Sequence, residues 1–475
     1  MKTDAADSAR GIVVAGLSGG SGKSVVAVGL AAAYAGQGRR VVPFKKGPDY
    51  IDAGWLQLAA GQPCYNLDPY LMSRPAMLRS FGDHCRTADI VILEGNRGLY
   101  DGVDLQGGYS TAELAVILEL PVLLVVDCTK TTRTVAAMVL GCRELDHRVK
   151  IGGVVLNRIG TSRHETMVRQ AVEHYTGIPV LGALPRQRRD FFPQRHLGIT
   201  PYQEHAEAHT IGADLAELVA KHLDLPAIAR IMGHCHAALG GQEEAPVVAP
   251  AMSGGGRSQV RIGVFRDAAF QFYYPDNLEA LVRAGAVLVE IDALRDPVLP
   301  ELEALYIGGG FPETSAAQLA ANQTFRESVR QRAAAGLPIY AECGGLIYLG
   351  ESITLDGQVF PLAGVLPVRF GLAEKPQAHG YTILEAIGAN PYYPLAAEIK
   401  GHEFRYSRVL AWQGQPADLV FAVKRGVGFA GGRDGLVHKN VLALYTHVHA
   451  LGTPQWAGSL VEKARQYQLS VINDQ

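Results

Sequence analysis

Two short segments of the chain combine residue types that could do chemistry. Residues 16–24 form a glycine-rich stretch that ends in Lys23 and Ser24. Backbone N–H groups of such a loop can surround phosphate oxygens, a lysine can reach the terminal phosphates, and a serine can bind magnesium. The second segment is Cys343 followed directly by Gly344, which is typical of a nucleophile at a tight turn.

The context of the first segment favours a phosphate-binding loop. An apolar run at residues 12–15 predicts a strand, and an apolar helical stretch begins at Ser24. Gly20 and Gly22 would let the backbone approach the phosphates of ATP. The strict G-x-x-x-x-G-K-[ST] pattern is lengthened by one residue, because Gly16 lies six positions before Gly22. ATPases of the partitioning type carry an extra lysine where this chain has Ser18.

Four carboxylates follow two further predicted strands. Asp49 and Asp52 come after the strand at residues 41–44, and Glu94 and Asp101 after the strand at residues 90–93. Ligands of open α/β sheets bind at the carboxyl ends of the strands. We therefore expect these acids near the phosphate loop, with Ser24 and Glu94 holding Mg²⁺. For any single acid, a solvated loop residue or helix cap is the alternative.

Two other features suggest ligand contacts in the same half of the chain. Asn157 ends a predicted strand, where its amide could bind adenine or form a turn. Further along the chain, four arginines lie within one stretch of ten residues. Guanidinium groups of arginine pair with carboxylates, so this cluster could bind a polyanionic substrate. A solvated basic loop is the alternative for this cluster, which consists of Arg186, Arg188, Arg189 and Arg195.

The surroundings of Cys343 predict acyl transfer. A buried strand at residues 338–341 precedes the cysteine, and a helix amino terminus at a thiol lowers the pKa of that thiol. Backbone N–H groups of three glycines would line an oxyanion hole. A histidine after another strand would move the protons. The glycines are Gly309, Gly310 and Gly344, and the candidate histidines are His447 and His449.

The spacing of apolar runs predicts the elements that position these residues. Runs at 12–15, 41–44, 90–93, 122–127 and 151–157 are separated by helix-length segments, which indicates a doubly wound parallel sheet. A second series of apolar runs, at 260–265, 287–291, 304–307 and 338–341, predicts further strands. Residues 240–259 are rich in Gly, Pro and Ser and read as a linker. We expect two doubly wound α/β domains, residues 1–239 and 260–475.

Composition narrows the partners of this 475-residue chain. Lys and Arg total 44 against 46 Asp and Glu, so no overall charge favours nucleic acid or an anionic membrane. No uncharged apolar run is long enough for a membrane span, and the amino terminus is polar, so we expect a cytoplasmic protein. The six cysteines include no C-x-x-C pair, which speaks against a zinc ribbon. The oligomeric state stays open, a homodimer included.

Taken together, these motifs resemble the cobyrinic acid a,c-diamide synthase family. The family's amino-terminal half is similar to dethiobiotin synthetase, and its carboxyl-terminal half is a class I glutamine amidotransferase domain. The match covers essentially the whole chain. Its motifs here are KKGPDYID, EGNRGLYDG, RDAAFQFYYPDNLE, GGGFPE, AECGG, GHEFRYS and YTHVH.

The resemblance implies ATP-dependent amidation of two acetate side chains on a polycarboxylate tetrapyrrole. An acyl phosphate would be attacked by ammonia released from L-glutamine. The nucleophile role falls on Cys343 and the base role on His447. Substrate and catalytic roles fall on Asp49, Tyr50, Glu94 and Asp101.

The chain departs from the family pattern in two places. Class I amidotransferases place a glutamate two residues after the histidine, where this chain has His449. Asn96 and Arg97 stand where corrin-modifying members have small or apolar residues. One alternative function is amidation of sirohydrochlorin or a siroheme precursor. A second is that of a cobyric acid synthase, although the KGPDYID motif speaks against it. A third is that of a P-loop regulatory ATPase with a silent amidotransferase-like domain.

Overall fold

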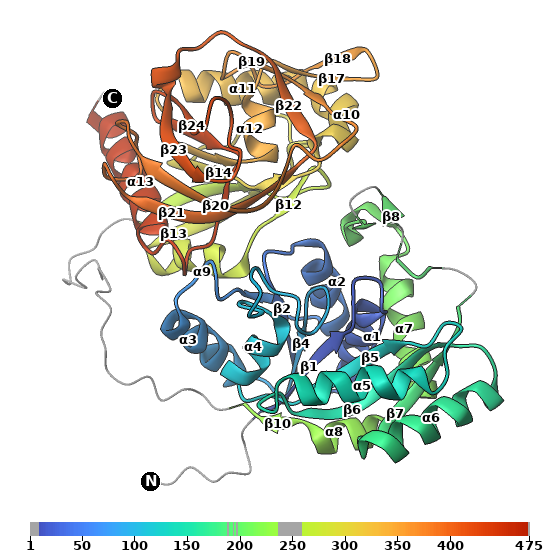
Figure 1. The fold of residues 1–475 in the computed structure, drawn as a ribbon. Coiled ribbons are helices and arrows are strands. Elements are labelled where there is room, and N and C mark those ends of the chain that lie inside the picture. Colours follow the sequence, from blue (N-terminus) through green and yellow to red (C-terminus); the bar gives the residue numbers. More distant parts are fainter. Residues whose placement is uncertain (1–8, 188–189, 193, 196–197, 236–258, 474–475) are drawn as a thin grey trace. The chain divides into compact units, whose positions relative to one another are not determined.

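The chain forms two compact units, Met1–Glu243 and Glu244–Gln475, in the computed structural model (Figure 1). The structure describes residues 9–187, 190–192, 194–195, 198–235 and 259–473. The predicted linker lies outside these ranges except for Gln259, as do Arg188 and Arg189. The domain boundaries given above therefore stay a prediction.

The first unit is built on the parallel sheet that the apolar runs predicted. Its strands lie in the order β3-β2-β4-β1-β5-β6-β7, and β10 pairs antiparallel with β1. The carboxyl ends of β1, β2 and β4 lie side by side, because β1 and β2 both pair in parallel with β4. The strands are β1 (Arg10–Gly16), β2 (Val41–Lys46), β3 (Tyr65–Leu67), β4 (Ile90–Glu94), β5 (Val122–Asp127), β6 (Ile151–Ile159), β7 (Val180–Pro185) and β10 (Gly233–His234).

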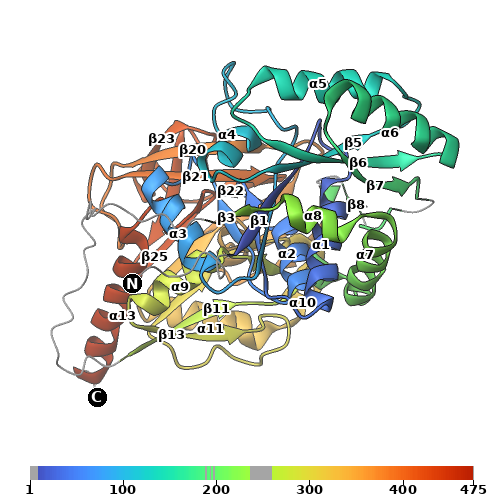
Figure 2. The same ribbon diagram turned by 90° about the horizontal axis from the view of Figure 1, so that it is seen from below.

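Helices cover both faces of this sheet. In Figure 2, α1 and α7 lie on one side of β5, β6 and β7, and α5 and α6 on the other. Val26 and Leu30 of α1 pack with Ile12 of β1, which fixes the start of α1 against the end of β1. The helices are α1 (Lys23–Gly36), α2 (Ile51–Ala60), α3 (Arg74–Cys85), α4 (Thr111–Ile117), α5 (Thr134–Leu145), α6 (Ser162–Thr176), α7 (Ala208–His222) and α8 (Leu225–Ile231), with a short hairpin of β8 (Gln194–Arg195) and β9 (Gly198–Ile199).

The second unit has a mixed sheet in the order β13-β11-β14-β16-β25-β24-β23-β20-β21-β26. The pairs from β13 to β25 are parallel and match the predicted strands, whereas those from β24 onward are antiparallel and were not predicted. The parallel half is β11 (Val260–Phe265), β13 (Ala286–Ile291), β14 (Ala304–Ile307), β16 (Ile339–Glu342) and β25 (Val441–Leu444). The antiparallel half is β20 (Ala378–Ala386), β21 (Glu398–Arg405), β23 (Leu419–Arg425), β24 (Arg433–His438) and β26 (His447–Val448).

Alternate residues of the parallel strands pack on opposite faces of this sheet. Tyr306 and Tyr340 contact Trp456 of α13 (Gln455–Asn473), whereas Ile307 and Ala341 join a separate core that includes Phe325. Because β16 is held between two cores, its carboxyl end has little freedom to move. The remaining elements are α9 (Pro275–Arg283), α10 (Ala316–Ala321), α11 (Gln323–Ala334), α12 (Gly344–Leu349), the pair β12 (Phe270–Phe272) and β15 (Gly309–Gly310), and the small sheet of β17 (Ser352–Leu355), β18 (Gln358–Pro361), β19 (Val368–Leu372) and β22 (Ser407–Trp412).

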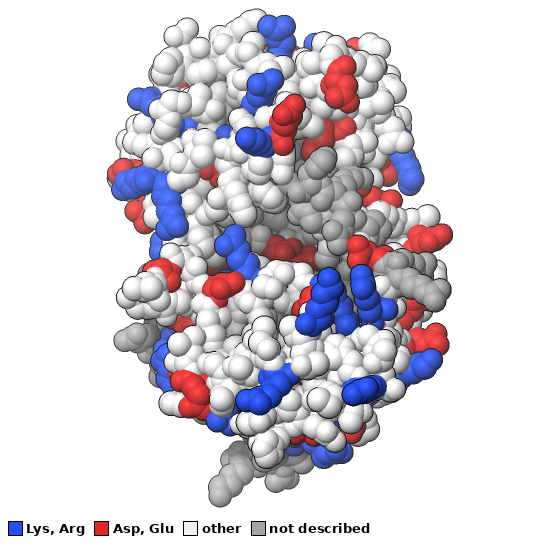
Figure 3. Space-filling model, turned by 45° about the vertical axis from the view of Figure 1, so that its right-hand side comes forward, with Lys and Arg blue, Asp and Glu red and all other residues white. Residues whose placement is uncertain are grey.

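The surface has no dominant charge on the face drawn in Figure 3. Lysine and arginine side chains are interspersed there with acidic and uncharged ones. Among the helices of the described ranges, none has the length and apolarity that a membrane span requires.

Candidate active sites

The predicted phosphate loop connects the end of β1 at Gly16 to the start of α1 at Lys23. Gly22 has a left-handed backbone with φ of 95°, and a Cβ atom there would lie 2.1 Å from Nδ2 of Asn157. Only glycine satisfies both conditions. The Ser21 hydroxyl braces the loop by donating to the Ser18 carbonyl at 2.7 Å and accepting from the Ser18 N–H at 3.1 Å. The loop is therefore held in shape by its own contacts.

Lys23 is buried in this loop. Its Nζ donates to the Ser18 carbonyl at 3.2 Å. Burial lowers the pKa of Lys23, although the negative charge of Glu94 opposes this shift. A neutral carbonyl is a weaker partner for an ammonium group than a phosphate oxygen is, so Lys23 is poised to exchange this contact for an anion.

Asn157 lies near the end of β6 and packs against the same loop. Its Nδ2 donates to the Ser21 carbonyl at 2.9 Å, and its Oδ1 accepts from the Arg158 N–H at 2.9 Å. The structure therefore gives Asn157 a role in bracing the phosphate loop. Its predicted contact with adenine stays a prediction.

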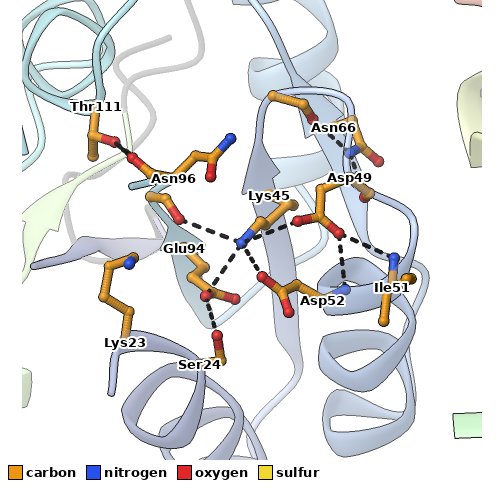
Figure 4. Close-up of polar contacts among 12 residues, drawn as sticks. Lys23, Ser24, Lys45, Asp49, Ile51, Asp52, Asn66, Glu94, Asn96 and Thr111 are labelled. Atoms are coloured by element: carbon orange, nitrogen blue, oxygen red, sulfur yellow. Dashed lines mark hydrogen bonds and ion pairs between the residues drawn. The ribbon is translucent and has the colours of Figure 1, made fainter. Parts of the chain in front are cut away.

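Asp49, Asp52 and Glu94 lie together at the carboxyl ends of β2 and β4 and form what we call the acidic edge. A buried lysine that was not predicted lies at its centre (Figure 4). The Lys45 Nζ lies 2.6 Å from Asp52, 3.2 Å from Glu94 and 3.7 Å from Asp49. Burial alone would lower the pKa of Lys45, but these three carboxylates raise it. Its signal in the sequence is a charged residue near the end of a fully buried strand, four residues before Asp49.

Ser24 and Glu94, the predicted magnesium ligands, are in contact. The Ser24 hydroxyl donates to Glu94 Oε1 at 2.7 Å, and Glu94 Oε2 is buried without a hydrogen-bond partner among the described residues. Burial raises the pKa of Glu94 to about 7. No group of three His, Cys, Asp or Glu side chains that could hold a metal occurs in the described ranges. A single carboxylate with an unused oxygen suits Mg²⁺, which usually binds one or two protein carboxylates together with substrate phosphates.

The other predicted substrate residues surround this edge. Asp49 Oδ1 accepts from the N–H groups of Ile51 and Asp52 at the start of α2, while burial and the Asp52 charge raise the pKa of Asp49 to about 6. Tyr50 is half-buried beside it. Asp101 is exposed, and its charge acts to raise the pKa of Lys23. Arg195 lies in the β8–β9 hairpin, apart from the sheet.

Replacing Lys45 with methionine should destabilise the chain strongly. The substitution leaves three carboxylates around a buried position without their cation, which costs about 3–5 kcal/mol when a buried pair loses one partner. Urea unfolding of the full chain measures this loss. Arg148→Met is the matched control, because it removes an exposed ion pair with Asp146 and should leave the unfolding curve unchanged. An unaltered curve for Lys45→Met would show that Lys45 is not what compensates the carboxylates.

The second site lies at the carboxyl end of β16. Cys343 follows this strand with φ of 45° and ψ of −93°, and α12 begins at the next residue. A non-glycine residue with positive φ is strained, and such strain is frequent at active sites. The turn places Cys343 at the amino terminus of α12, as the glycine after Cys343 predicted.

The three predicted oxyanion glycines converge on this turn. A Cβ atom at Gly344 would lie 3.0 Å from the backbone N of Gly310. Gly310 has φ of 156°, and a Cβ atom there would lie 2.0 Å from the Ala269 carbonyl, so no side chain fits. A Cβ atom at Gly309 would lie 2.3 Å from Cε1 of His447. The glycines therefore bring the backbone close to both Cys343 and His447. That their N–H groups form an oxyanion hole stays a prediction.

The structure separates the two candidate histidines. His447 hydrogen-bonds with Cys343 and Glu342; burial would lower its pKa, but these contacts raise the pKa of His447 to about 10. His449 lies 3.6 Å from Asp276 and packs on the ring of Tyr274. Sequence reasoning missed Glu342, whose signal is a charged residue at the end of a fully buried strand.

These geometries define a class of protein. A phosphate loop beside an acidic edge characterises a P-loop nucleotide-binding unit, and a strained cysteine beside a histidine and three glycines characterises a glutamine amidotransferase unit. Residues 12–197 match the CobQ/CobB/MinD/ParA nucleotide binding domain, and residues 261–455 match the CobB/CobQ-like glutamine amidotransferase domain. The predicted fold class is confirmed for both units.

Full-length relatives identify the family. A cobyrinate a,c-diamide synthase of Magnetococcus marinus is 43% identical over 447 residues, which cover 94% of this chain and 95% of the relative. The protein of the same name from Archaeoglobus fulgidus is 40% identical over 458 residues, covering 95% and 97%. The chain belongs to the cobyrinate a,c-diamide synthase family, and the resemblance drawn from its motifs is confirmed.

Proposed function

We propose that this chain uses ATP and glutamine to amidate the a- and c-acetate carboxylates of cobyrinic or hydrogenobyrinic acid. The observation that carries this proposal is the presence in one chain of a complete phosphate loop with its acidic edge and a complete cysteine–histidine site. The relatives named cobyrinate a,c-diamide synthase support the choice of substrate.

The first unit activates the carboxylate. Backbone N–H groups of Gly20 and Gly22 and the Lys23 ammonium hold the phosphates of ATP, and Ser24 and Glu94 are the residues that would hold Mg²⁺. The magnesium ion supplies positive charge that neutralises the phosphates. A substrate acetate oxygen attacks the γ-phosphorus atom, ADP leaves, and an acyl phosphate forms.

The acidic edge then serves the amidation step. Ammonia attacks the acyl carbon, phosphate leaves, and the nitrogen loses a proton. Asp49, with its pKa raised to about 6 by burial and by Asp52, is suited to accept that proton near neutral pH. Tyr50, Asp101 and Arg195 are assigned to substrate binding.

The second unit supplies the ammonia. Cys343 attacks the side-chain amide of glutamine, and the N–H groups of Gly309, Gly310 and Gly344 stabilise the oxyanion. His447 gives a proton to the leaving ammonia, and water then releases glutamate from the thioester. Delivery of ammonia along an enclosed path keeps it reactive, because ammonia in neutral water is mostly protonated.

Product analysis tests this function. Cobyrinic acid and sirohydrochlorin are each incubated with the full chain, ATP and glutamine, and the products are examined by mass spectrometry. A gain of two amides on cobyrinic acid with none on sirohydrochlorin is expected. Amidation of sirohydrochlorin alone would show that sirohydrochlorin is the substrate. Asn96 and Arg97, which stand where corrin-modifying members have small or apolar residues, would be consistent with that outcome. ATP hydrolysis without any amide product would point to a regulatory ATPase instead.

A further inference from the structure

Glu342, the residue directly before the nucleophile, binds the strand that carries His447. Its Oε2 lies 3.3 Å from Nδ1 of His447, and its Oε1 accepts from the Val448 N–H at 3.3 Å. One carboxylate therefore contacts both the imidazole ring and the backbone of β26. These groups are 105 and 106 residues apart in the sequence.

The carboxylate of Glu342 is buried, so it would destabilise the fold unless other groups replaced its contacts with water. The residue is 0% exposed and ends a strand that lies between β14 and β25. A buried carboxylate is stable only when its partners replace water. Burial raises the pKa of Glu342, while His447, the Val448 N–H and Tyr306 act to lower it. The contacts with His447 and Val448 thus explain how a carboxylate is stable at this position, although the neighbouring strand residues are apolar or aromatic.

The surroundings of His447 leave one ring nitrogen for the nucleophile. Because Nδ1 faces Glu342, Nε2 is the nitrogen available to Cys343, with which His447 is hydrogen-bonded. The Gly309 backbone lies against the Cε1 edge, and His402 stacks on the ring at 4.9 Å with an interplanar angle of 20°. Burial lowers the pKa of His402, so this neighbour is neutral. The ring is therefore held on three sides.

We propose that Glu342 is a positioning residue that orients His447 and stabilises its protonated form, in place of the glutamate that class I amidotransferases carry where this chain has His449. This inference rests on the proposed glutamine hydrolysis. The Cys343 thiol passes its proton to His447 Nε2, and Nδ1–H donates to the Glu342 carboxylate. The thiolate forms the thioester, and the same proton leaves with ammonia. Water then hydrolyses the thioester, and the thiol regains a proton through His447.

His449 and Asp276 provide a matched comparison. They form a second buried histidine–carboxylate pair in the same unit, with 3.6 Å between Nε2 and Oδ2. Asp276 belongs to α9 and interacts with His449, whereas the Glu342 carboxylate bonds to His447. Asp276→Asn therefore removes a comparable buried charge without removing the carboxylate that faces the nucleophile's partner.

The experiment compares Glu342→Gln, Glu342→Asp and Asp276→Asn in the full chain. The readouts are kcat and KM of glutamine hydrolysis, amidation with ammonium salt, and the pH dependence of Cys343 alkylation by iodoacetamide, followed on the Cys343 peptide by mass spectrometry. Glu342→Gln should lower kcat about a hundredfold or more with little change in KM. It should also raise the apparent pKa of the thiol by about one unit or more, because the imidazolium partner of the thiolate loses its carboxylate.

The remaining outcomes separate the inference from the proposed function. Glu342→Asp should recover part of kcat, and Asp276→Asn should keep the thiol pKa of the unaltered chain; all variants should keep ammonium-supported amidation. A Glu342→Gln chain with unchanged kcat and thiol pKa would overturn the inference alone. If Glu342→Gln does not fold, Glu342→Asp decides by the same pKa readout, and an unchanged value overturns the inference. An unaltered chain without glutamine hydrolysis would overturn the proposed function.

Discussion

Cys343→Ala is expected to lower glutamine-supported amidation by about a thousandfold or more, since removal of a catalytic nucleophile costs at least this much in comparable enzymes. Amidation with ammonium salt should be unchanged, because the phosphate loop and acidic edge are built entirely from residues of the first unit. Amide formation from each nitrogen source, measured at saturating ATP, gives the two rates.

Cys142→Ala is the control for the loss of a thiol. Cys142 is half-buried in α5, and its side chain takes no part in either site. This variant should keep both rates. Loss of both rates in a folded Cys343→Ala chain would contradict the division of the chemistry between two sites, and retention of both would remove Cys343 from the mechanism.

Lys23→Met is expected to lower amidation from both nitrogen sources. The substitution removes the charged donor that we assign to the phosphates of ATP, and loss of a single preorganised donor costs about a hundredfold to a thousandfold in rate. Glutamine hydrolysis should persist, because the contacts of Cys343 and His447 come from the second unit. ADP release and glutamate release, followed in the same reaction, separate the two effects.

Two variants make this result specific. Lys23→Arg keeps the charge on a longer and planar group and should retain an intermediate rate. Lys221→Met removes a lysine on the exposed side of α7 and should retain the full rate. Normal amidation by Lys23→Met would exclude the loop as the site of phosphate transfer.

Much of the fold and both reactive centres could be predicted because their signals are local. The phosphate loop lies between consecutive elements, β1 and α1, and the nucleophile turn between β16 and α12. In each case strand, glycines and reactive residue are neighbours in the chain, so composition over about ten residues is enough. Most of the parallel strands were also predicted, since buried parallel strands read as continuous apolar runs, although β3 and β7 were missed.

The antiparallel half of the second sheet was missed for the opposite reason. In β20 and β21 buried residues are interspersed with half-buried and exposed ones, so neither strand forms the continuous apolar run that marked the parallel strands. Their partners follow only from pairing, as when β21 pairs with β26 and brings His402 opposite His447.

What the sequence alone determined is therefore the family to which the chain belongs, together with the two candidate reactive groups, Lys23 and Cys343, whose roles stay predictions. Only the tertiary structure decided which charges they face. Lys45 meets Glu94 because β2 and β4 are neighbours in the sheet, although 49 residues separate them in the chain. Glu342 meets His447 across 105 residues. A local pattern cannot encode such pairs, because a buried charge finds its partner through the packing of distant strands.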